Sequence, residues 1–329
     1  MAPTTSMPPS LGTFWRLKRL TGFPQAIRER GAHRIPRTMA GTVADRPRDL
    51  LVSGHVIIDR FLSVRSFPAA DRTVPVLEMR AELGGTATNI VRAASRLGVA
   101  TGLVARVGDG FPDEYVTEFR RAGVDVRGLK RIGGKPTPTC YIIEDRSGAQ
   151  RTLIDQGVMG GKQEVTPPAR WLGEYSWLHL TTADPAFQLR LKKAARARGL
   201  RVAADPAQEI HYRWDRRSFR SLLRGSELLF GNRSEIARAL EFVGAHRPEG
   251  LLEFVPLVIR TEGRAGATAF SRAGTVHVGA TRPVRVRTLV GAGDAFRGGF
   301  YAAWFAGQPL YACLTAGTRS SARWIEGTR

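Results

Sequence analysis

Short apolar runs alternate with longer amphipathic segments along most of the chain, from about residue 50 onward. Short apolar runs are typical of buried strands, whereas apolar residues three or four positions apart are typical of helices that pack on one face. The segment Thr86–Leu97 has the helical spacing, and Gly98 is expected to end that helix. Repeated strand–helix units predict an α/β fold in which a doubly wound, mostly parallel sheet is flanked by helices on both faces.

The same patterns place the individual elements. Strands are expected at Leu51–Ile58, Thr101–Val107, Trp177–Leu180, Arg201–Ala204, Glu227–Phe230, Val255–Ile259 and Thr268–Phe270. Helices are expected at Thr86–Leu97, Tyr115–Ala122, Phe187–Arg198, Ala295–Ala306 and Leu310–Ile325. Because helices connect several of these strands, neighbouring strands are expected to run parallel.

Two stretches, residues 61–83 and 137–155, interrupt the alternation. The second contains the strand-like runs Thr139–Glu144 and Arg151–Asp155 on either side of a turn, which favours a hairpin. We expect the strands of both stretches to pair into a small second sheet. Such a sheet is suited to cover an active site as a lid.

Residues 1–49 differ from the rest of the chain, with nine Lys and Arg against three Asp and Glu, several prolines and little periodicity. Such a composition seldom packs a core, so it predicts a basic, disordered N-terminal extension ahead of one folded domain over residues 50–329. The apolar and basic cluster Leu11–Leu20 leaves open that the extension binds a membrane surface or a partner.

Charge and cysteine content narrow the class of protein. The 329 residues carry a formal net charge of +21, which would attract nucleic acid or phosphorylated ligands. The arginines are spread over the whole chain and no nucleic-acid-binding motif accompanies them, so we expect no specific nucleic-acid binding. No apolar run is long enough to predict a membrane span. Cys140 and Cys313 are too far apart for a disulfide framework, which favours a cytoplasmic location.

The clearest chemical signal is the run Gly291, Ala292, Gly293 and Asp294, directly before the predicted helix Ala295–Ala306. Small residues leave the first amides of a helix accessible, and a helix N-terminus attracts anions such as phosphate. A carboxylate beside those amides can take a proton from an attacking hydroxyl. The combination indicates phosphoryl transfer to an alcohol.

A second glycine-rich turn, Gly84 and Gly85, opens the predicted helix Thr86–Leu97. Paired glycines let a ligand approach the backbone, and Asn89 can both donate and accept hydrogen bonds to a polyol. Asp59 follows the first predicted strand, at the end of a strand where open α/β sheets bind ligands. The structural alternatives are a plain turn with a capping threonine and, for the aspartate, a surface turn residue.

Two further segments follow predicted strands in the second half of the chain. Asn232 and Glu235 lie three residues apart on the first turn of a helix. They can hold Mg²⁺ through water near a phosphate, or form a capping box, and the two roles are compatible. The segment from Thr261 through Gly263 to Gly266 either lines a nucleotide or forms a hairpin turn.

Together these segments resemble the ribokinase-like, or PfkB, family of sugar and nucleoside kinases over about residues 50–325. Residues 84–98 and 105–109 are similar to the first family signature, and residues 291–296 to the second. Asp205-Pro206 and Asn232-x-x-Glu235 fall where the family carries a DP element and an NxxE motif. Four ordered matches are more specific than any one of them.

The resemblance implies a role for each candidate residue. Asp294 would be the general base, and the backbone of Gly291, Ala292 and Gly293 would form the anion hole. The other positions would divide between the two substrates and the metal. Asp59, Gly84, Gly85 and Asn89 would bind the acceptor; Asn232, Thr261, Gly263 and Gly266 would bind the nucleotide; and Glu235 would hold Mg²⁺ through water.

The implied activity is a Mg²⁺-dependent transfer of the terminal phosphoryl group of ATP to a hydroxyl of a sugar or nucleoside, with a ribose-like acceptor favoured. ADP as donor stays open. The alternatives are a sugar-phosphate kinase, favoured if Arg106 or Arg151 lies near the acceptor, a non-catalytic protein with a kinase fold, and a nucleic-acid-binding protein.

A homodimer through the lid is also implied. Thr288–Val290 replace the family's usual Asp-Thr-x, which puts the monovalent-cation site of many relatives in doubt.

Overall fold

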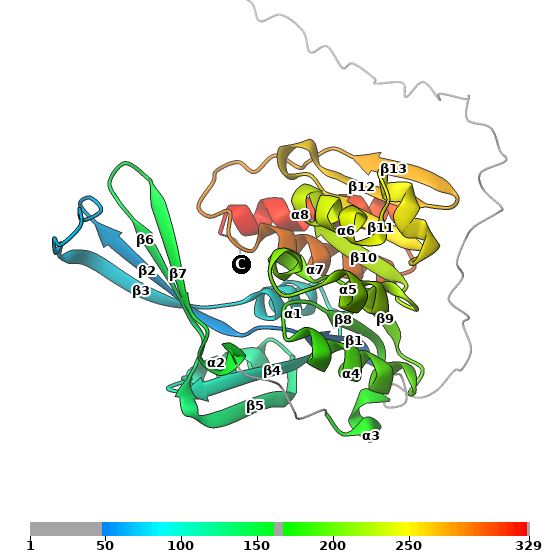
Figure 1. The fold of residues 1–329 in the computed structure, drawn as a ribbon, viewed down its shortest axis with the longest axis horizontal. Helices are drawn as coiled ribbons and strands as arrows, with labels where there is room; N and C mark the ends of the chain where they lie inside the picture. The colour runs from blue at the N-terminus through cyan, green and yellow to red at the C-terminus, as the bar shows by residue number, and fades with distance from the viewer. Residues whose placement is uncertain (1–47, 161–166, 328–329) are drawn as a thin grey trace, which may run out of the picture. The chain divides into compact units, whose positions relative to one another are not determined.

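The computed structural model describes residues 48–160 and 167–327, which form two β-sheets and the helices that pack against the larger one (Figure 1). The predicted N-terminal extension lies outside the described residues except for Arg48 and Asp49, which begin the first strand. None of the helices within these two described ranges is long and apolar enough to cross a membrane. Cys140 and Cys313 are both free thiols.

The larger sheet has nine strands, and all neighbours run parallel except at one edge. From that edge the order is β13 (Gly274–Val278), β12 (Ala267–Ser271), β11 (Leu257–Thr261), β10 (Leu228–Asn232), β9 (Arg201–Ala204), β8 (Tyr175–Leu180), β1 (Arg48–Ser53), β4 (Thr101–Asp109) and β5 (Asp125–Pro136). Strand β12 runs antiparallel to both of its neighbours, β11 and β13. The doubly wound, mostly parallel sheet predicted from the strand–helix alternation is confirmed.

Alternating side chains of the strands divide the core into two layers, one on each face of the sheet. In β1, Leu50 and Val52 belong to one hydrophobic cluster and Leu51 to the other. The first cluster includes residues of α1 (Thr86–Arg96), α2 (Asp113–Arg121), α7 (Ala292–Phe305) and α8 (Leu310–Ile325). The second includes residues of α3 (Ala169–Leu172), α4 (Pro185–Arg196), α5 (Arg216–Leu223) and α6 (Arg233–Val243).

The second sheet has four strands in the order β3 (Val76–Gly84), β2 (Ile57–Val64), β6 (Thr139–Glu144) and β7 (Gln150–Asp155). It is built from the two stretches that interrupt the strand–helix alternation, so the predicted small sheet is confirmed, while its role as a lid remains a prediction. Asp59 pairs with Cys140 of β6 and with Glu82 of β3, which places these three side chains on one face of the small sheet.

One predicted element is wrong. The apolar run Leu51–Ile58 is not a single strand, because β1 ends at Ser53 and β2 begins at Ile57 in the other sheet. Between them Gly54 packs so closely that an added Cβ would lie 2.4 Å from Cγ2 of Thr181. Asp59 therefore lies inside a strand of the small sheet and does not follow a strand of the large one.

Candidate active site

Helix α7 begins at the glycine-rich run, and small residues explain how it packs. Gly291 is its N-cap and has a left-handed backbone with φ of 81°. Further along the helix, a Cβ on Gly298 would lie 2.5 Å from that of Ala93, so glycine lets α7 approach α1 closely. The close contact brings the first turn of α7 next to the side chains of α1.

Asp294 lies in this first turn and accepts a hydrogen bond from Nδ2 of Asn89 at 2.9 Å. Burial raises the pKa of Asp294 to about 7, although the positive charge of Arg297 and the bond from Asn89 act in the opposite direction. The nearby carboxylates of Asp205 and Glu235 raise it further. A carboxyl with this pKa can exchange a proton near neutral pH.

The predicted anion-hole segment, residues 291–293, is partly open to solvent. Gly291 and Ala292 are half-buried and Gly293 is exposed. The amide of Ala292 donates a long bond of 3.3 Å to the carbonyl of Leu289 in the preceding loop. That amide is available to an anion only if this weak bond opens.

The residues predicted to bind the acceptor come from β2, β3 and α1, and a close contact connects two of them, Gly84 and Asp59. A Cβ on Gly84 would lie 1.9 Å from Oδ2 of Asp59, so only glycine leaves room for this carboxylate. Gly85 is the N-cap of α1 with φ of 97°. Asn89 extends the group to Asp294 through its hydrogen bond. The structure thus brings Gly84 and Asp59 together and connects Asn89 with the predicted base.

The residues predicted to bind the nucleotide meet at the ends of β10 and β11, where Asn232 pairs with Thr261. Asn232 and Glu235 form the capping box: Oδ1 of Asn232 accepts from the Glu235 amide at 2.9 Å, and Oε2 of Glu235 accepts from the Asn232 amide at 2.7 Å. Burial raises the pKa of Glu235. Gly263 and Gly266 lie in the hairpin turn between β11 and β12, where the Glu262 amide donates to the Gly266 carbonyl at 2.8 Å.

The side chains at the predicted nucleotide site suit a magnesium ion that is held mainly by water and phosphate. Among residues 48–160 and 167–327 no group of three or more His, Cys, Asp or Glu side chains could hold a metal ion. Mg²⁺ commonly keeps several waters and binds through one or two carboxylates plus the phosphates of a nucleotide. Glu235, which is 8% exposed at the start of α6, fits that pattern.

The sequence patterns missed a buried polar network behind the first turn of α7. It contains Arg297, Asp205, His179 and Tyr301, each at most 5% exposed. One signal pointed to it: Arg297 is the only charged residue between Ala295 and Phe305, an otherwise mostly apolar helical segment. A charged side chain within such a segment is rarely buried without a partner.

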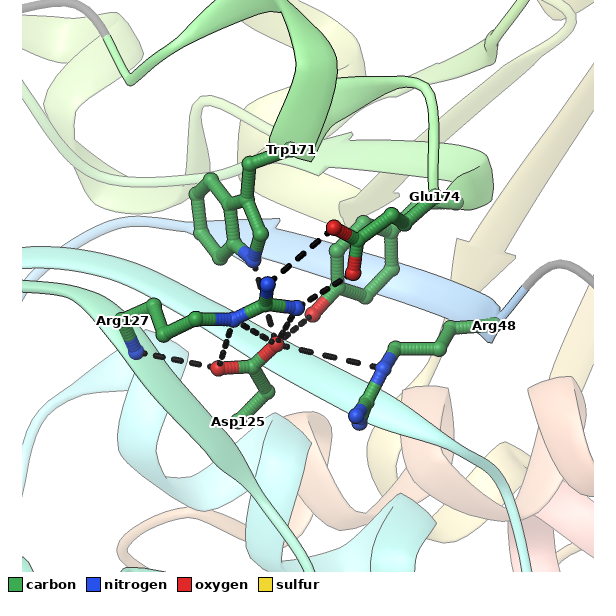
Figure 2. Close-up of polar contacts among 6 residues, drawn as sticks. Arg48, Asp125, Arg127, Trp171 and Glu174 are labelled. Atoms are coloured by element: carbon green, nitrogen blue, oxygen red, sulfur yellow. Dashed lines mark hydrogen bonds and ion pairs between the residues drawn. The ribbon is translucent and has the colours of Figure 1, made fainter. Parts of the chain in front are cut away.

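A second charged cluster, drawn in Figure 2, lies where β5 and β8 begin and so is remote from the site. The buried carboxylate of Asp125 accepts from Nη2 of Arg127 at 2.6 Å, the Tyr175 hydroxyl at 2.8 Å and Nε1 of Trp171 at 3.1 Å. Burial alone would raise the pKa of Asp125, but these hydrogen bonds outweigh it and hold the pKa below its ordinary value. The cluster stabilises the start of these strands.

The fold and the site together define a ribokinase-like kinase. They combine a large, mostly parallel sheet, a small second sheet, and an acid, Asp294, in the first turn of a helix that begins at a glycine. The chain belongs to the pfkB family of carbohydrate kinases, whose sequence model matches residues 47–327. The predicted family, fold class and kinase class are thereby confirmed, and an enzyme is favoured over a non-catalytic protein with a kinase fold.

Individual relatives agree with this assignment. The chain is 30% identical to a nucleoside kinase of Methanothermobacter thermautotrophicus, over 81% of this chain and 85% of that protein. It is also 30% identical to an ATP-dependent ribose-1-phosphate kinase of Halopiger xanaduensis, over 78% of this chain and 84% of that protein. The crystal structure of a nucleoside kinase of Methanocaldococcus jannaschii, an archaeal member of the ribokinase family, has the same fold. It superimposes with a TM-score of 0.79 at 24% identity, over 85% of this chain and 93% of that one.

Proposed function

We propose that this protein is a Mg²⁺-dependent kinase that transfers the terminal phosphoryl group of ATP to a ribose hydroxyl of a nucleoside. The observation that carries the proposal is the placement of Asp294. It lies in the first turn of α7, beside amides suited to bind phosphate, and its raised pKa of about 7 suits a general base at neutral pH.

In the proposed reaction the acceptor oxygen attacks the terminal phosphorus of ATP, and the bond to the bridging oxygen of ADP breaks. The hydroxyl proton passes to a carboxylate oxygen of Asp294. Amides of Gly291, Ala292 and Gly293 stabilise the charge on the transferred group. Glu235 and Asn232 would hold Mg²⁺ through water, and the ion would neutralise charge on the nucleotide phosphates. Thr261, Gly263 and Gly266, at the end of β11 and in the turn that follows it, are proposed to line the nucleotide.

Acceptor binding is assigned to Asp59, Gly84, Gly85 and Asn89, with the small sheet as a lid. The name of the relative from M. thermautotrophicus supports a nucleoside acceptor, and that of the relative from H. xanaduensis supports ATP as donor.

The latter relative's name also keeps a sugar-phosphate acceptor as a second candidate. The two arginines that would favour it are not well placed. The strand register puts Arg151 on the face of the small sheet opposite Asp59 and Cys140, where its guanidinium stacks on Phe67. In β4, alternation puts Arg106 on the face opposite α1 and α7.

A phosphorylation screen tests the proposal. ATP and ADP are each offered with nucleosides, ribose, and ribose 1-phosphate in the presence of Mg²⁺, and the products are identified by mass spectrometry. We expect nucleoside monophosphate from ATP, and loss of product when Mg²⁺ is chelated. Preferential phosphorylation of ribose 1-phosphate would support the second candidate, and turnover of no acceptor would contradict the proposal.

We also propose a cytoplasmic homodimer that forms through the small sheet. Apolar side chains of two of its strands are exposed, including Met79 at 58% and Leu153 at 62%, and exposed apolar patches often mark interfaces. We expect the molar mass from light scattering to be that of two chains, and replacement of Met79 and Leu153 by serine to reduce it to one. A wild-type protein with the mass of one chain would contradict the dimer.

A further inference from the structure

A buried ion pair lies directly behind the phosphoryl-binding turn, which we define as residues 291–294. Nη2 of Arg297 donates to Oδ1 of Asp205 at 2.7 Å, and Nε donates to Oδ2. The same guanidinium donates through Nη1 to the carbonyl of Gly293 at 2.9 Å. Because a bidentate Arg–carboxylate pair has a well-defined geometry, it fixes this carbonyl relative to the end of β9, which Asp205 follows.

The carboxylate of Asp205 is held from a second side as well. Its Oδ2 lies 3.1 Å from Nε2 of His179, and Nδ1 of His179 lies 2.8 Å from the hydroxyl of Tyr301. Burial lowers the pKa of His179 and raises that of Tyr301. A neutral imidazole therefore donates to Asp205 and accepts from Tyr301. Arg297 and Tyr301 both belong to α7. The hydrogen-bond network therefore connects this helix to β8 and to the residue that follows β9.

We propose that Arg297 is a positioning residue that fixes the phosphoryl-binding turn, and with it the carboxyl of Asp294, relative to the sheet. The inference rests on the proposed function of that turn. Arg297 is 5% exposed and its guanidinium is engaged by Asp205 and Gly293, so it acts through the turn and not on the substrate. A shift of about 1 Å in such a turn can cost about 10²-fold in rate.

The charge of Arg297 has a second effect on the same site. The groups that act on Asp294 are Arg297 from α7, Asp205 after β9, Glu235 from α6 and the neutral amide of Asn89 from α1. Arg297 is the cation of this set and opposes the two carboxylates. Its loss is expected to raise the pKa of Asp294. Loss of Arg297 together with Asp205 is expected to do the same, because the effect of Arg297 on this pKa is larger than the opposite effect of Asp205.

The test needs a variant that folds without the ion pair. Arg297→Met alone leaves the buried carboxylate of Asp205 without its cation, which can unfold the protein. The double variant Arg297→Met/Asp205→Asn removes both charges and avoids this penalty. Lys192→Met is the matched control. It removes a buried cation on the other face of the sheet, whose Nζ donates to the carbonyls of Leu222 and Arg224 at 2.6 Å each.

Each protein is measured for thermal unfolding and for kcat and acceptor KM as a function of pH. We expect the double variant to lose about 10²-fold in kcat with little change in acceptor KM. The acid limb of its pH profile should move to higher pH. Lys192→Met should unfold at a lower temperature but keep the kcat and the pH limb of the wild type. Arg297→Lys keeps the charge but not the bidentate geometry. It should restore the acid limb of the pH profile to its wild-type position, but not the full kcat.

Two failures are distinguishable. A double variant with the kcat and the pH limb of the wild type would show that the network is merely structural and would overturn the inference, whatever its stability. A wild-type protein that phosphorylates no acceptor, assayed beside Asp294→Asn, would overturn the proposed function and the inference with it.

Discussion

Replacing Asp294 with asparagine is expected to lower kcat ~10²–10⁴-fold, which is the usual contribution of a general base. The fold should persist, because the amide oxygen of the new side chain can still accept from Nδ2 of Asn89, which lies 2.9 Å from Oδ2 of the wild-type side chain. Steady-state kinetics with a nucleoside and ATP, together with thermal unfolding, measure the two effects.

Stability should not fall at neutral pH. Asp294 has a folded-state pKa raised to about 7, well above the value of about 3.9 in an unfolded chain. Ionisation of such a group costs stability progressively as the pH rises from the unfolded to the folded pKa, and fully above it. The neutral variant escapes this cost, so its unfolding temperature is expected to equal or exceed that of the wild type.

The pH profile and a control variant isolate the role of the carboxylate. Wild-type kcat/KM should fall as the pH decreases through about 7, because Asp294 must be ionised to accept a proton. The residual activity of Asp294→Asn should lack this limb. Asp113→Asn replaces an exposed acid in the first turn of α2 and should behave as wild type. An Asp294→Asn enzyme with most of its activity would count against the assignment.

Gly291→Ala is expected to lower kcat ~10²-fold or more, as the loss of an anion-hole donor does in other enzymes. The backbone φ at Gly291 is 81°, and a side chain in that conformation costs about 1–2 kcal/mol. In addition, the new Cβ would lie 2.9 Å from Nε1 of Trp324 and 3.0 Å from Nδ2 of Asn89. Relief of these contacts displaces the phosphoryl-binding turn or the amide that binds Asp294.

Gly307→Ala is the control that separates the effect of backbone strain from the effect of displacing the phosphoryl-binding turn. Gly307 follows the same helix and has φ of 69°, but a Cβ there would meet nothing within 4 Å. Its replacement should cost a similar strain in the free energy of unfolding and leave kcat unchanged. If the two alanine variants had equal kcat, the phosphoryl-binding turn would not be the anion hole. Denaturant unfolding and steady-state kinetics on both variants provide the comparison.

Elements with strong local patterns could be predicted from the sequence. Helix α8 and strand β9 have the predicted bounds, because their apolar spacing matches the faces that they bury. Strand β5 was not predicted, because an edge strand contacts one neighbour only and most of its side chains are polar or glycine. The apolar run through Gly54 likewise carries no sign that the chain changes sheets there.

In the candidate site too, local features could be predicted from the sequence and long-range contacts could not. Asp294 and the capping box of Asn232 and Glu235 could be singled out from the sequence because each lies within the first turn of a helix, where spacing along the chain indicates position in space. The contact between Arg297 and Asp205 spans 92 residues, and no local pattern specifies which carboxylate meets a buried arginine. The sequence could have indicated only that Arg297 needs a partner.

Single-turnover product analysis tests the proposed role of Asp294 as general base, because it observes phosphoryl transfer without product release. Excess enzyme is mixed with Mg²⁺, ATP and a nucleoside, and the nucleoside monophosphate formed is followed by mass spectrometry for the wild type and for Asp294→Asn. We expect rapid formation of monophosphate by the wild type, which slows as the pH falls below about 7, and at most slow formation by the variant at every pH. Equal rates for the two proteins would contradict this role.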